Sequence, residues 1–449
     1  MPKALIILAA GQGTRMQSDL PKVLHKVAGA PLFAHALASG AALEPERIVL
    51  VAGHGAEAVR AAALEIDPEI TVVVQQEQLG TAHAVAQARE ALADFEGDAF
   101  VLYGDTPFVR PETLEKMAQA RGQHDVIVLG FTAADPGRYG RLVMQGETLE
   151  KIVEFKDADE SERAIDLCNS GVICADATQL FAMIEAIGNE NASGEYYLTD
   201  IVEVARARGL SAGCVVCDEA ETLGINTRAQ LAEAEAAFQA RARAQAFENG
   251  VTMQAPETVF FAFDTFVGRD AEIEPNVYFG PGVTVESGAR IRAFSHLEGC
   301  HVSTGATVGP YARLRPGAEL GNDTHIGNFV EIKNAEICEG AKVNHLSYIG
   351  DARIGERTNI GAGTITCNYD GVFKHHTEIG ADAFIGSNTM LVAPVKVGAA
   401  AMTASGSVIT SEIPAGDLAI GRSKQVNKPG FALRLFDKLL AAKAAKQKG

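Results

Sequence analysis

The residues best suited to chemistry lie between Leu8 and Lys22, in the run LAAGQGTRMQSDLPK. Gly11 and Gly13 allow the backbone to turn several N–H groups toward one anion, and a helix beginning just after them would add the positive end of its dipole. Arg15 and Lys22 bring fixed positive charge. The run lacks the third glycine of the dinucleotide fingerprint and the Gly-Lys-Ser/Thr ending of a P-loop. It predicts phosphate binding of another type, or else an ordinary strand-to-helix turn with two surface cations.

Two further polar segments, 75–81 and 103–105, each follow an apolar run. The side-chain amide of Gln75 is suited to hydrogen bonding with the edge of a nucleobase. The Asp105 carboxylate, after a buried run, is suited to a divalent cation that bridges phosphates, although a turn residue or a helix N-cap is the commoner role of a lone aspartate. Ligands of parallel sheets bind beyond the carboxyl ends of the strands, so we expect all three segments to meet in one crevice.

The elements that must position these residues alternate along the first half. Alternation of short apolar strands with helices predicts an α/β fold, a Rossmann-like and mostly parallel sheet with helices on both faces. We expect this domain to cover residues 1–228 and a linker helix, more a spacer than a functional element, to cover 229–249. The predicted strands are 4–8, 47–51, 70–74, 99–103 and 126–130, and the predicted helices are 31–43, 57–64 and 81–92.

Together with Gln-Leu-Gly-Thr at 78–81, Tyr-Gly-Asp at 103–105 and Glu-Phe-Lys-Asp at 154–157, the glycine-rich run resembles the sugar-phosphate nucleotidyltransferases. That family joins a sugar 1-phosphate to the α-phosphorus of a nucleoside triphosphate and releases pyrophosphate. The sugar phosphate is already a nucleophile, so no Ser or Cys is required. By this resemblance, Arg15 and Lys22 face the phosphates, and Asp105 with Asn226 holds Mg²⁺. The nucleotide- and sugar-binding residues implied are Leu8, Ala9, Ala10, Gly11, Lys22, Gln75, Gly80, Thr81, Tyr103, Gly104, Asp105, Gly140, Glu154, Asn169 and Asn226.

From about residue 250 the apolar period becomes six residues, which fits neither a helix nor an alternating strand. This period predicts a left-handed parallel β-helix of hexapeptide repeats, in which stacked coils bury one aliphatic residue per short strand. Residues 366–377 have no repeat residue in register, so we expect them to loop out. The repeat positions are Val267, Ile273, Phe279, Val285, Ile291, Leu297, Val302, Val308, Leu314, Leu320, Ile326, Ile332, Ile354, Ile360, Ile379, Ile385, Leu391 and Val397.

Four polar residues lie close to these coil positions: Lys333, His345, Tyr348 and Asn359. Together with their neighbours they carry a second resemblance. Residues 315–318, 331–334, 344–351 and 359–371 resemble the family of bifunctional N-acetylglucosamine-1-phosphate uridyltransferases and glucosamine-1-phosphate acetyltransferases, in domain order over essentially the whole chain. The resemblance implies that residues 250–449, including a C-terminal tail helix, acetylate glucosamine 1-phosphate from acetyl-CoA. The first domain would then transfer UMP from UTP to the product, giving UDP-N-acetylglucosamine for peptidoglycan and lipopolysaccharide synthesis.

Carried over residue by residue, the resemblance makes His345 the general base, a task that suits imidazole. It assigns the amino-sugar phosphate to Arg315, Lys333, Tyr348 and Asn359. Ser405 stands where alanine is often found, which matters little if the contact is through the backbone. The family forms trimers with each acetyl site between coils, so we expect a homotrimer. The residues implied for acetyl-CoA are Ala362, Asn368, Tyr369, Ser387, Ser405 and Arg422.

Bulk composition limits the partners. The net charge of −18 argues against a general nucleic-acid or anionic membrane surface, so small-molecule substrates are expected. Seven scattered cysteines fit a reducing cytoplasm, and the apolar run 4–10 is too short to span a membrane. Two other hypotheses stay open at this point: a nucleotidyltransferase with a structural β-helix, and a non-enzymatic assembly or binding protein built on the coil.

Overall fold

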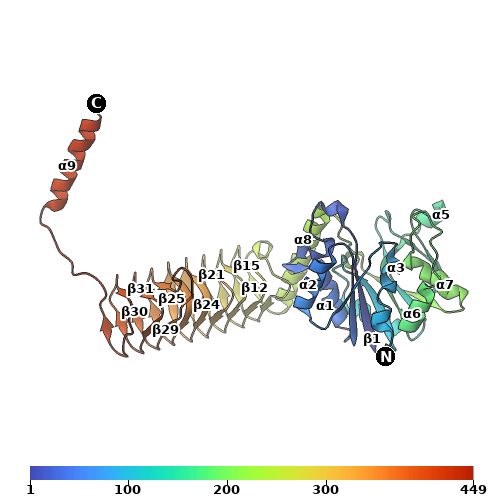
Figure 1. Ribbon diagram of the computed structural model, residues 1–449, viewed down its shortest axis with the longest axis horizontal. Coiled ribbons are helices and arrows are strands. Elements are labelled where there is room, and N and C mark those ends of the chain that lie inside the picture. The colour runs from blue at the N-terminus through green and yellow to red at the C-terminus, as the bar shows by residue number, and fades with distance from the viewer. Residues whose placement is uncertain (448–449) are drawn as a thin grey trace. The chain divides into compact units, whose positions relative to one another are not determined.

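The computed structural model describes residues 1–447, and its contacts divide the chain into two compact units. The first unit is Met1–Gln245 with Phe261–Phe263. The second unit is Ala246–Phe260 together with the described chain from Asp264 onward. The first contains a sheet covered by helices, and the second is a stack of short strands (Figure 1).

The sheet of the first unit has the strand order β11-β7-β10-β6-β1-β4-β5. β1 runs parallel to β4 and β6, β4 to β5, and β11 to β7, whereas β10 is antiparallel to β6 and β7. The sheet is therefore mostly parallel, as predicted. The bounds are β1 Lys3–Ala9, β4 Arg47–Ala52, β5 Thr71–Val74, β6 Asp98–Tyr103, β7 Val126–Thr132, β10 Leu167–Asp176 and β11 Ala212–Cys217, with β2 Lys26–Val27 and β3 Ala30–Pro31 forming a separate short pair.

Alternate residues of β1 enter different apolar layers, which shows that both faces of the sheet are covered. Ile6 and Leu8 pack with helices α3, α6 and α7, whereas Leu5 and Ile7 pack with α1, α2 and α4. The period of two along a strand produces this division. The helices are α1 Leu32–Ala41, α2 Ala56–Ile66, α3 Thr81–Ala86, α4 Pro111–Ala120, α5 Glu160–Arg163, α6 Ala177–Ile184 and α7 Ile201–Ala207, with 3-10 turns η2 Lys22–Leu24, η4 Leu198–Asp200 and η5 Glu219–Glu221.

Two sequence expectations about helices were wrong in part. The glycine-rich run leads into a single 3-10 turn, η1 (Thr14–Met16), and not into an α-helix, so no helix dipole points at this loop. The predicted helix 81–92 is α3 followed by the 3-10 turn η3 (Glu90–Leu92). The sequence also gave no sign of the antiparallel hairpin β8 (Arg141–Gln145) and β9 (Thr148–Val153), which extends β10.

Helix α8 (Arg228–Glu248) corresponds to the predicted linker helix, and it packs on the first unit. Leu231 and Phe238 lie against a small apolar cluster, and Glu235 accepts a 2.7 Å hydrogen bond from the backbone N–H of Ala28. The helix is therefore more than the spacer that its composition suggested.

In the second unit, every repeat position named from the sequence is buried, with exposed fractions of 8% or less. The chain returns to the same place on the coil after 17 or 18 residues, as the spacing of paired side chains shows. Steps of five instead of six between apolar residues, as from Leu297 to Val302, account for the shorter turns. The predicted parallel β-helix is confirmed.

One ladder of the coil contains β12 Thr252–Met253, β14 Glu272–Ile273, β17 Arg290–Ile291, β20 Thr307–Val308, β23 His325–Asn328, β25 Lys342–His345, β27 Asn359–Ile360, β30 Phe384–Ile385, β33 Met402–Thr403 and β35 Leu418–Ala419. The other sheet contains β13 Phe266–Val267, β15 Tyr278–Phe279, β16 Val283–Val285, β18 His296–Leu297, β19 Cys300–Val302, β21 Arg313–Leu314, β22 Ala318–Leu320, β24 Glu331–Ile337, β26 Tyr348–Ile354, β28 Ile365–Cys367, β29 Thr377–Ile379, β31 Met390–Val392, β32 Val395–Val397 and β34 Val408–Ile409. A 3-10 turn, η6 (Pro256–Thr258), follows β12.

The predicted loop is present but shorter than expected. One coil is lengthened to 25 residues, as the Arg357–Asp382 pair shows. Thr366 and Thr377 are nevertheless buried in strands, with exposed fractions of 1% and 0%. Threonine replaces the aliphatic residue at these positions, and only 368–376 leaves the coil.

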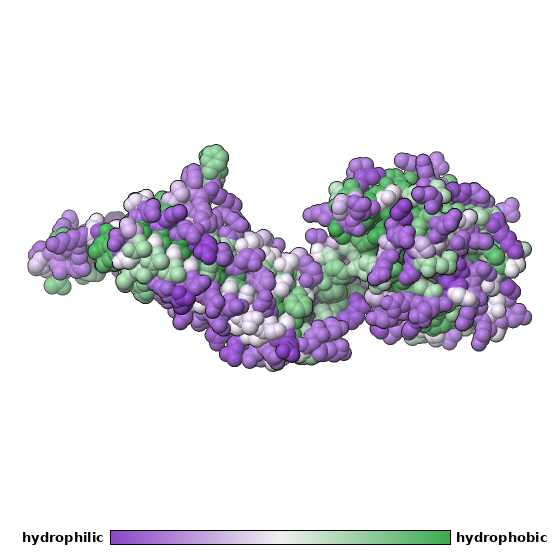
Figure 2. All heavy atoms as spheres, turned by 90° about the horizontal axis from the view of Figure 1, so that it is seen from below, coloured by the Kyte–Doolittle hydropathy of each residue, from purple (hydrophilic) through white to green (hydrophobic). Residues whose placement is uncertain are grey.

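Helix α9 (Phe431–Lys446) forms the predicted tail, and its apolar side chains are exposed. The surface in Figure 2 shows hydrophobic residues among hydrophilic ones on the coil as well. Within residues 1–447, no helix has the length and apolar character needed to cross a bilayer.

Candidate functional site

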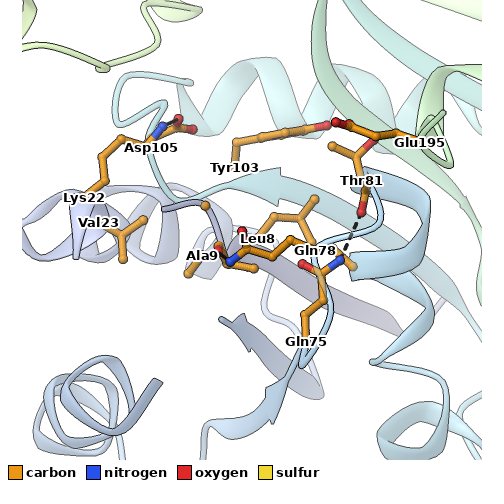
Figure 3. A pocket seen from close by; sticks show the side chains of 14 residues that line it. Leu8, Ala9, Lys22, Val23, Gln75, Gln78, Thr81, Tyr103, Asp105 and Glu195 are labelled. Atoms are coloured by element: carbon orange, nitrogen blue, oxygen red, sulfur yellow. Dashed lines mark hydrogen bonds and ion pairs between the residues drawn. The ribbon is translucent and has the colours of Figure 1, made fainter. Parts of the chain in front are cut away.

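A cavity of about 340 Å³ lies beyond the carboxyl ends of β1, β5 and β6. The three segments predicted to converge all contribute to it, and Figure 3 shows their side chains around one space. Gln78, which belongs to the predicted segment 75–81, also lines the cavity, and so do Val23, Ala84 and Glu195, which were not expected to do so. The predicted residues in its lining are Leu8, Ala9, Ala10, Gly11, Lys22, Gln75, Gly80, Thr81, Tyr103 and Asp105.

At one end of this cavity, backbone contacts fix the loop that carries Gln75. The Gln75 side-chain nitrogen donates to the Gly80 carbonyl at 3.1 Å. Gly80 has φ 118°, and a Cβ placed there would lie 2.5 Å from the Tyr196 carbonyl oxygen, so only glycine fits. Thr81 accepts a 2.9 Å hydrogen bond from the backbone N–H of Leu198. These contacts give a rigid loop with an amide facing the space.

At the opposite end, Lys22 joins the two predicted metal ligands. Its ammonium nitrogen forms an ion pair with Asp105 and lies 3.0 Å from the Asn226 side-chain oxygen. Asp105 and Asn226 lie 83 and 204 positions after Lys22 in the chain, yet both direct a side-chain oxygen at its ammonium group. One carboxylate and one amide oxygen are suited to Mg²⁺, which keeps several positions for water and phosphate oxygens. Within residues 1–447, no group of three or more His, Cys, Asp or Glu side chains is arranged to hold a metal ion.

The predicted sugar-binding residues lie together beside Tyr103. A Cβ on Gly140 would lie 3.4 Å from a Glu154 carboxylate oxygen and 3.6 Å from the Asn169 Cβ. Burial raises the pKa of Glu154, whose carboxylate accepts a 3.3 Å hydrogen bond from the Thr199 hydroxyl. Burial, followed by the charges of Asp105 and Glu154, raises the pKa of Tyr103. Tyr103 is therefore a neutral phenol that feels the charges of both carboxylates.

Arg15 is exposed on η1, next to the glycine-rich loop and outside the lining of the cavity. Gly104 packs under the floor, because a Cβ there would meet the Leu8 carbonyl oxygen at 3.2 Å and the Phe33 Cβ at 3.3 Å.

In the second unit, His345 stands exposed at the end of β25. Its Nδ1 lies 2.9 Å from the side-chain oxygen of Asn328, which occupies the same position one coil earlier. If Nδ1 carries the proton in this bond, as the acceptor oxygen requires, Nε2 is left as a free base.

The predicted acetyl-CoA residues continue the line that His345 begins. The His345 carbonyl accepts from the Gly363 N–H at 3.1 Å, the Ala362 carbonyl from Asn388 at 2.7 Å, and the Ser387 carbonyl from Gly406 at 2.8 Å. Ala362, Ser387 and Ser405 therefore follow one corner of the coil, turn after turn. Tyr369 and Arg422 are exposed, and Asn368 is buried.

Three of the four predicted amino-sugar residues share one part of the coil. Arg315 donates a 2.9 Å hydrogen bond to Glu331. Glu331 and Lys333 belong to the same strand, β24, and Glu331 pairs with Tyr348 on the next coil. Asn359 is not brought to them, because it lies on β27 in the other sheet, where it pairs with Lys342.

The Lys333 ammonium lies beside two groups that the sequence did not single out. It is 3.8 Å from an oxygen of the buried Asp351, and it contacts Lys374 of the loop, whose pKa it lowers. Two neighbouring ammonium groups with one buried carboxylate leave positive charge for an anion.

Comparisons with known proteins extend over the whole length of the chain. A family model described as the MobA-like NTP transferase domain matches residues 5–169. The Bifunctional protein GlmU of Ruegeria sp. (strain TM1040) is 70% identical over 449 residues, covering 100% of both chains. Those of Jannaschia sp. (strain CCS1) and Cereibacter sphaeroides are 66% and 71% identical, each covering at least 98% of both chains. The chain belongs to the GlmU family.

Among solved structures, a UDP-glucose pyrophosphorylase complexed with UDP-glucose covers 54% of the chain at 18% identity, with a TM-score of 0.44. The assignment to the GlmU family rests on the full-length relatives, and it agrees with both resemblances seen in the sequence.

Within this GlmU-family chain, sequence reasoning missed Asn328 and Lys374. A usable signal existed for Asn328, since it precedes His345 by 17 residues, the length of one coil. No such signal marked Lys374, because its loop lies outside the repeat.

Proposed function

We propose that the first unit transfers UMP from UTP to N-acetylglucosamine 1-phosphate and releases pyrophosphate. The observation that carries this proposal is the convergence of the Asp105 and Asn226 oxygens on one cation, Lys22, at the end of the cavity that also contains Gln75. Such a site binds a triphosphate between an amide suited to a base and a cationic centre suited to phosphates.

In this proposal, the sugar phosphate oxygen attacks the α-phosphorus of UTP and the bond to pyrophosphate breaks. Glu154 and Asn169 hold the sugar, and Gly140 leaves room for it. Lys22 supplies positive charge where the phosphates meet. Asp105 and Asn226 would hold Mg²⁺, which stabilises the charge that develops on the transferred phosphoryl group.

We also propose that the second unit acetylates glucosamine 1-phosphate. The amine nitrogen attacks the thioester carbonyl of acetyl-CoA, His345 Nε2 takes a proton from that nitrogen, and the C–S bond breaks to release the CoA thiol. Asn328 fixes the ring through Nδ1. Arg315, Lys333 and Tyr348 hold the sugar phosphate, and Ala362, Asn368, Tyr369, Ser387, Ser405 and Arg422 contact acetyl-CoA.

A homotrimer is part of the proposal, supported by an exposed aromatic ladder at the coil corner next to His345. Phe294 stacks on Tyr311 with ring centroids 4.8 Å apart, and Tyr311 on Phe329 at 5.3 Å. Leu346 continues the ladder and is 62% exposed. Exposed apolar surface of this kind marks an interaction face. A second copy packed there could bring its Asn359 to the Arg315, Lys333 and Tyr348 of the first, which one chain does not do.

The experiment supplies the full-length protein with each substrate pair. Acetyl-CoA with glucosamine 1-phosphate should release thiol, and UTP with N-acetylglucosamine 1-phosphate should release pyrophosphate only with Mg²⁺ present. Pyrophosphate without thiol would support the one-reaction alternative with a structural coil. Neither product would support a binding protein. UTP and acetyl-CoA are cytoplasmic metabolites, so we place the protein in the cytoplasm.

A further inference from the structure

His83 is a half-buried histidine of α3 that the proposed reaction does not use, and its ring contacts Gln75. We propose that His83 is a positioning residue, which fixes the side-chain amide of Gln75 so that only its oxygen is offered to the nucleobase. This inference rests on the proposed uridyl transfer and assigns its base selectivity to a pair of residues.

The hydrogen bonds of the Gln75 amide leave one orientation. The nitrogen Nε2 donates at 3.1 Å to the Gly80 carbonyl and lies 3.0 Å from His83 Nδ1. A carbonyl oxygen only accepts, so the atom beside Gly80 must be the nitrogen. Both amide hydrogens are then engaged. Gln75 is 4% exposed and lines the cavity, and no residue within 1–447 bonds its Oε1.

The same contacts set the tautomer of His83. A neutral imidazole has one acceptor nitrogen. Two amide nitrogens face the ring, and that of Gln75, 3.0 Å from Nδ1, is closer than that of Gln87, which lies 3.3 Å from Nε2 and also donates to the His83 carbonyl at 2.9 Å. The acceptor is therefore Nδ1, assigned from the network of donors and acceptors. Without the Nδ1 acceptor, one amide hydrogen of the buried Gln75 side chain would have no hydrogen-bond partner, and the amide could rotate.

A fixed Oε1 requires a hydrogen-bond donor from the ligand. The pairing edge of uracil presents the N3–H donor between two carbonyl oxygens, whereas N3 of cytosine is an acceptor. Two acceptors facing each other repel, and a buried acceptor without a donor is costly. The geometry therefore favours a uracil-type base over a cytosine-type base at this position.

The test compares His83→Leu with His83→Asn in the full-length protein, using UTP and CTP as nucleotides. Leucine removes the acceptor, whereas the asparagine oxygen can replace Nδ1. We expect His83→Leu to raise the KM for UTP about tenfold with a smaller change in kcat, the effect of one lost hydrogen bond. We expect the UTP-over-CTP ratio of kcat/KM to fall about tenfold, and His83→Asn to stay within about threefold of wild type. Acetyl transfer by the same preparations should not change, which controls for folding.

Two results would overturn the inference: His83→Leu with unchanged base preference, or His83→Asn as impaired as His83→Leu, which would mean that ring size and not the acceptor matters. Calorimetric titration with UTP alone gives a readout that does not depend on turnover. Failure of the proposed uridyl transfer itself would be seen separately, since the wild-type protein would then form no product from UTP.

Discussion

The two sites are built by opposite means. In the first unit, residues from distant parts of the chain, such as Lys22, Asp105 and Asn226, meet at one edge of a sheet around a cavity. In the second unit, residues that contact each other in the site, such as Asn328 and His345, are separated by one coil of 17 residues along the chain, and His345 is exposed. The sheet encloses its site within one chain, whereas the coil carries its residues on an exposed surface, which a second copy would complete in the proposed trimer. Single substitutions at each site test this contrast.

The largest expected effect is on acetyl transfer. His345→Ala should lower its rate about 10³-fold, within the usual range for loss of a general base, and leave uridyl transfer unchanged. His301→Ala is the matched control, because His301 pairs with Glu286 elsewhere on the coil. Initial rates of thiol and pyrophosphate release measure both reactions. A parallel fall in the two rates, with folding intact, would contradict independent sites.

The converse change is Lys22→Met, which removes the cation between Asp105 and Asn226. We expect uridyl transfer to fall about 10²–10³-fold, as for other preorganised charges, with acetyl transfer unchanged. Lys26→Met serves as the control, since Lys26 is exposed nearby. An equal loss in both lysine variants would refute a specific role for Lys22.

A smaller effect tests the one-coil spacing of the second site. Asn328→Leu removes the oxygen that orients His345, and we expect acetyl transfer to slow about tenfold, the effect of one hydrogen bond. Asn328→Asp keeps an acceptor and should stay within about threefold of wild type. The measurement is kcat for thiol release over a range of pH. If both variants behave alike, Asn328 does not act through the ring.

The smallest effect concerns Asp200, a half-buried carboxyl near Glu154 in the first unit. Burial, followed by the charges of Glu203 and Glu154, raises the pKa of Asp200 to about 6. The folded carboxyl binds its proton more tightly than the unfolded one, so its stabilisation is full below the unfolded pKa of about 4 and is lost as the pH rises through about 6.

The Asp200→Asn side chain carries no charge at any pH, so it avoids the cost of a buried carboxylate. The variant should therefore stabilise the first unit at pH 7.5. We expect a gain on the order of 1 kcal/mol, because solvent screens a half-exposed group. Thermal unfolding at pH 7.5 and 5.0 measures it, and the gain should shrink at the lower pH. An equal gain at both pH values would show that the Asp200 charge is not responsible.

The contrast between the units also explains what the sequence could predict. A coil repeats, so one apolar residue in six identified much of its interior, from Val267 to Val397, whereas buried threonines such as Thr366 and Thr377 escaped the pattern. In the first unit the motifs found the residues of the cavity, and the parallel-sheet rule predicted that they meet. The position of Lys22 between Asp105 and Asn226 could not be foreseen, because no local pattern links residues so far apart.

Other misses have physical causes too. The antiparallel β10 was not among the predicted strands, because Asn169, Ser170 and Gly171 interrupt its apolar residues where its register shifts. The glycine-rich run was expected to open a helix, but it opens only η1, and η2 and the short β2–β3 pair follow before α1 begins.

The most direct test of two separate sites mixes the variants His345→Ala and Lys22→Met. Each variant alone, given glucosamine 1-phosphate, acetyl-CoA, UTP and Mg²⁺, should form almost no UDP-N-acetylglucosamine, and an equimolar mixture should restore it, because one variant acetylates the sugar that the other uridylates. A mixture as inactive as its parts, with both proteins folded, would contradict the account.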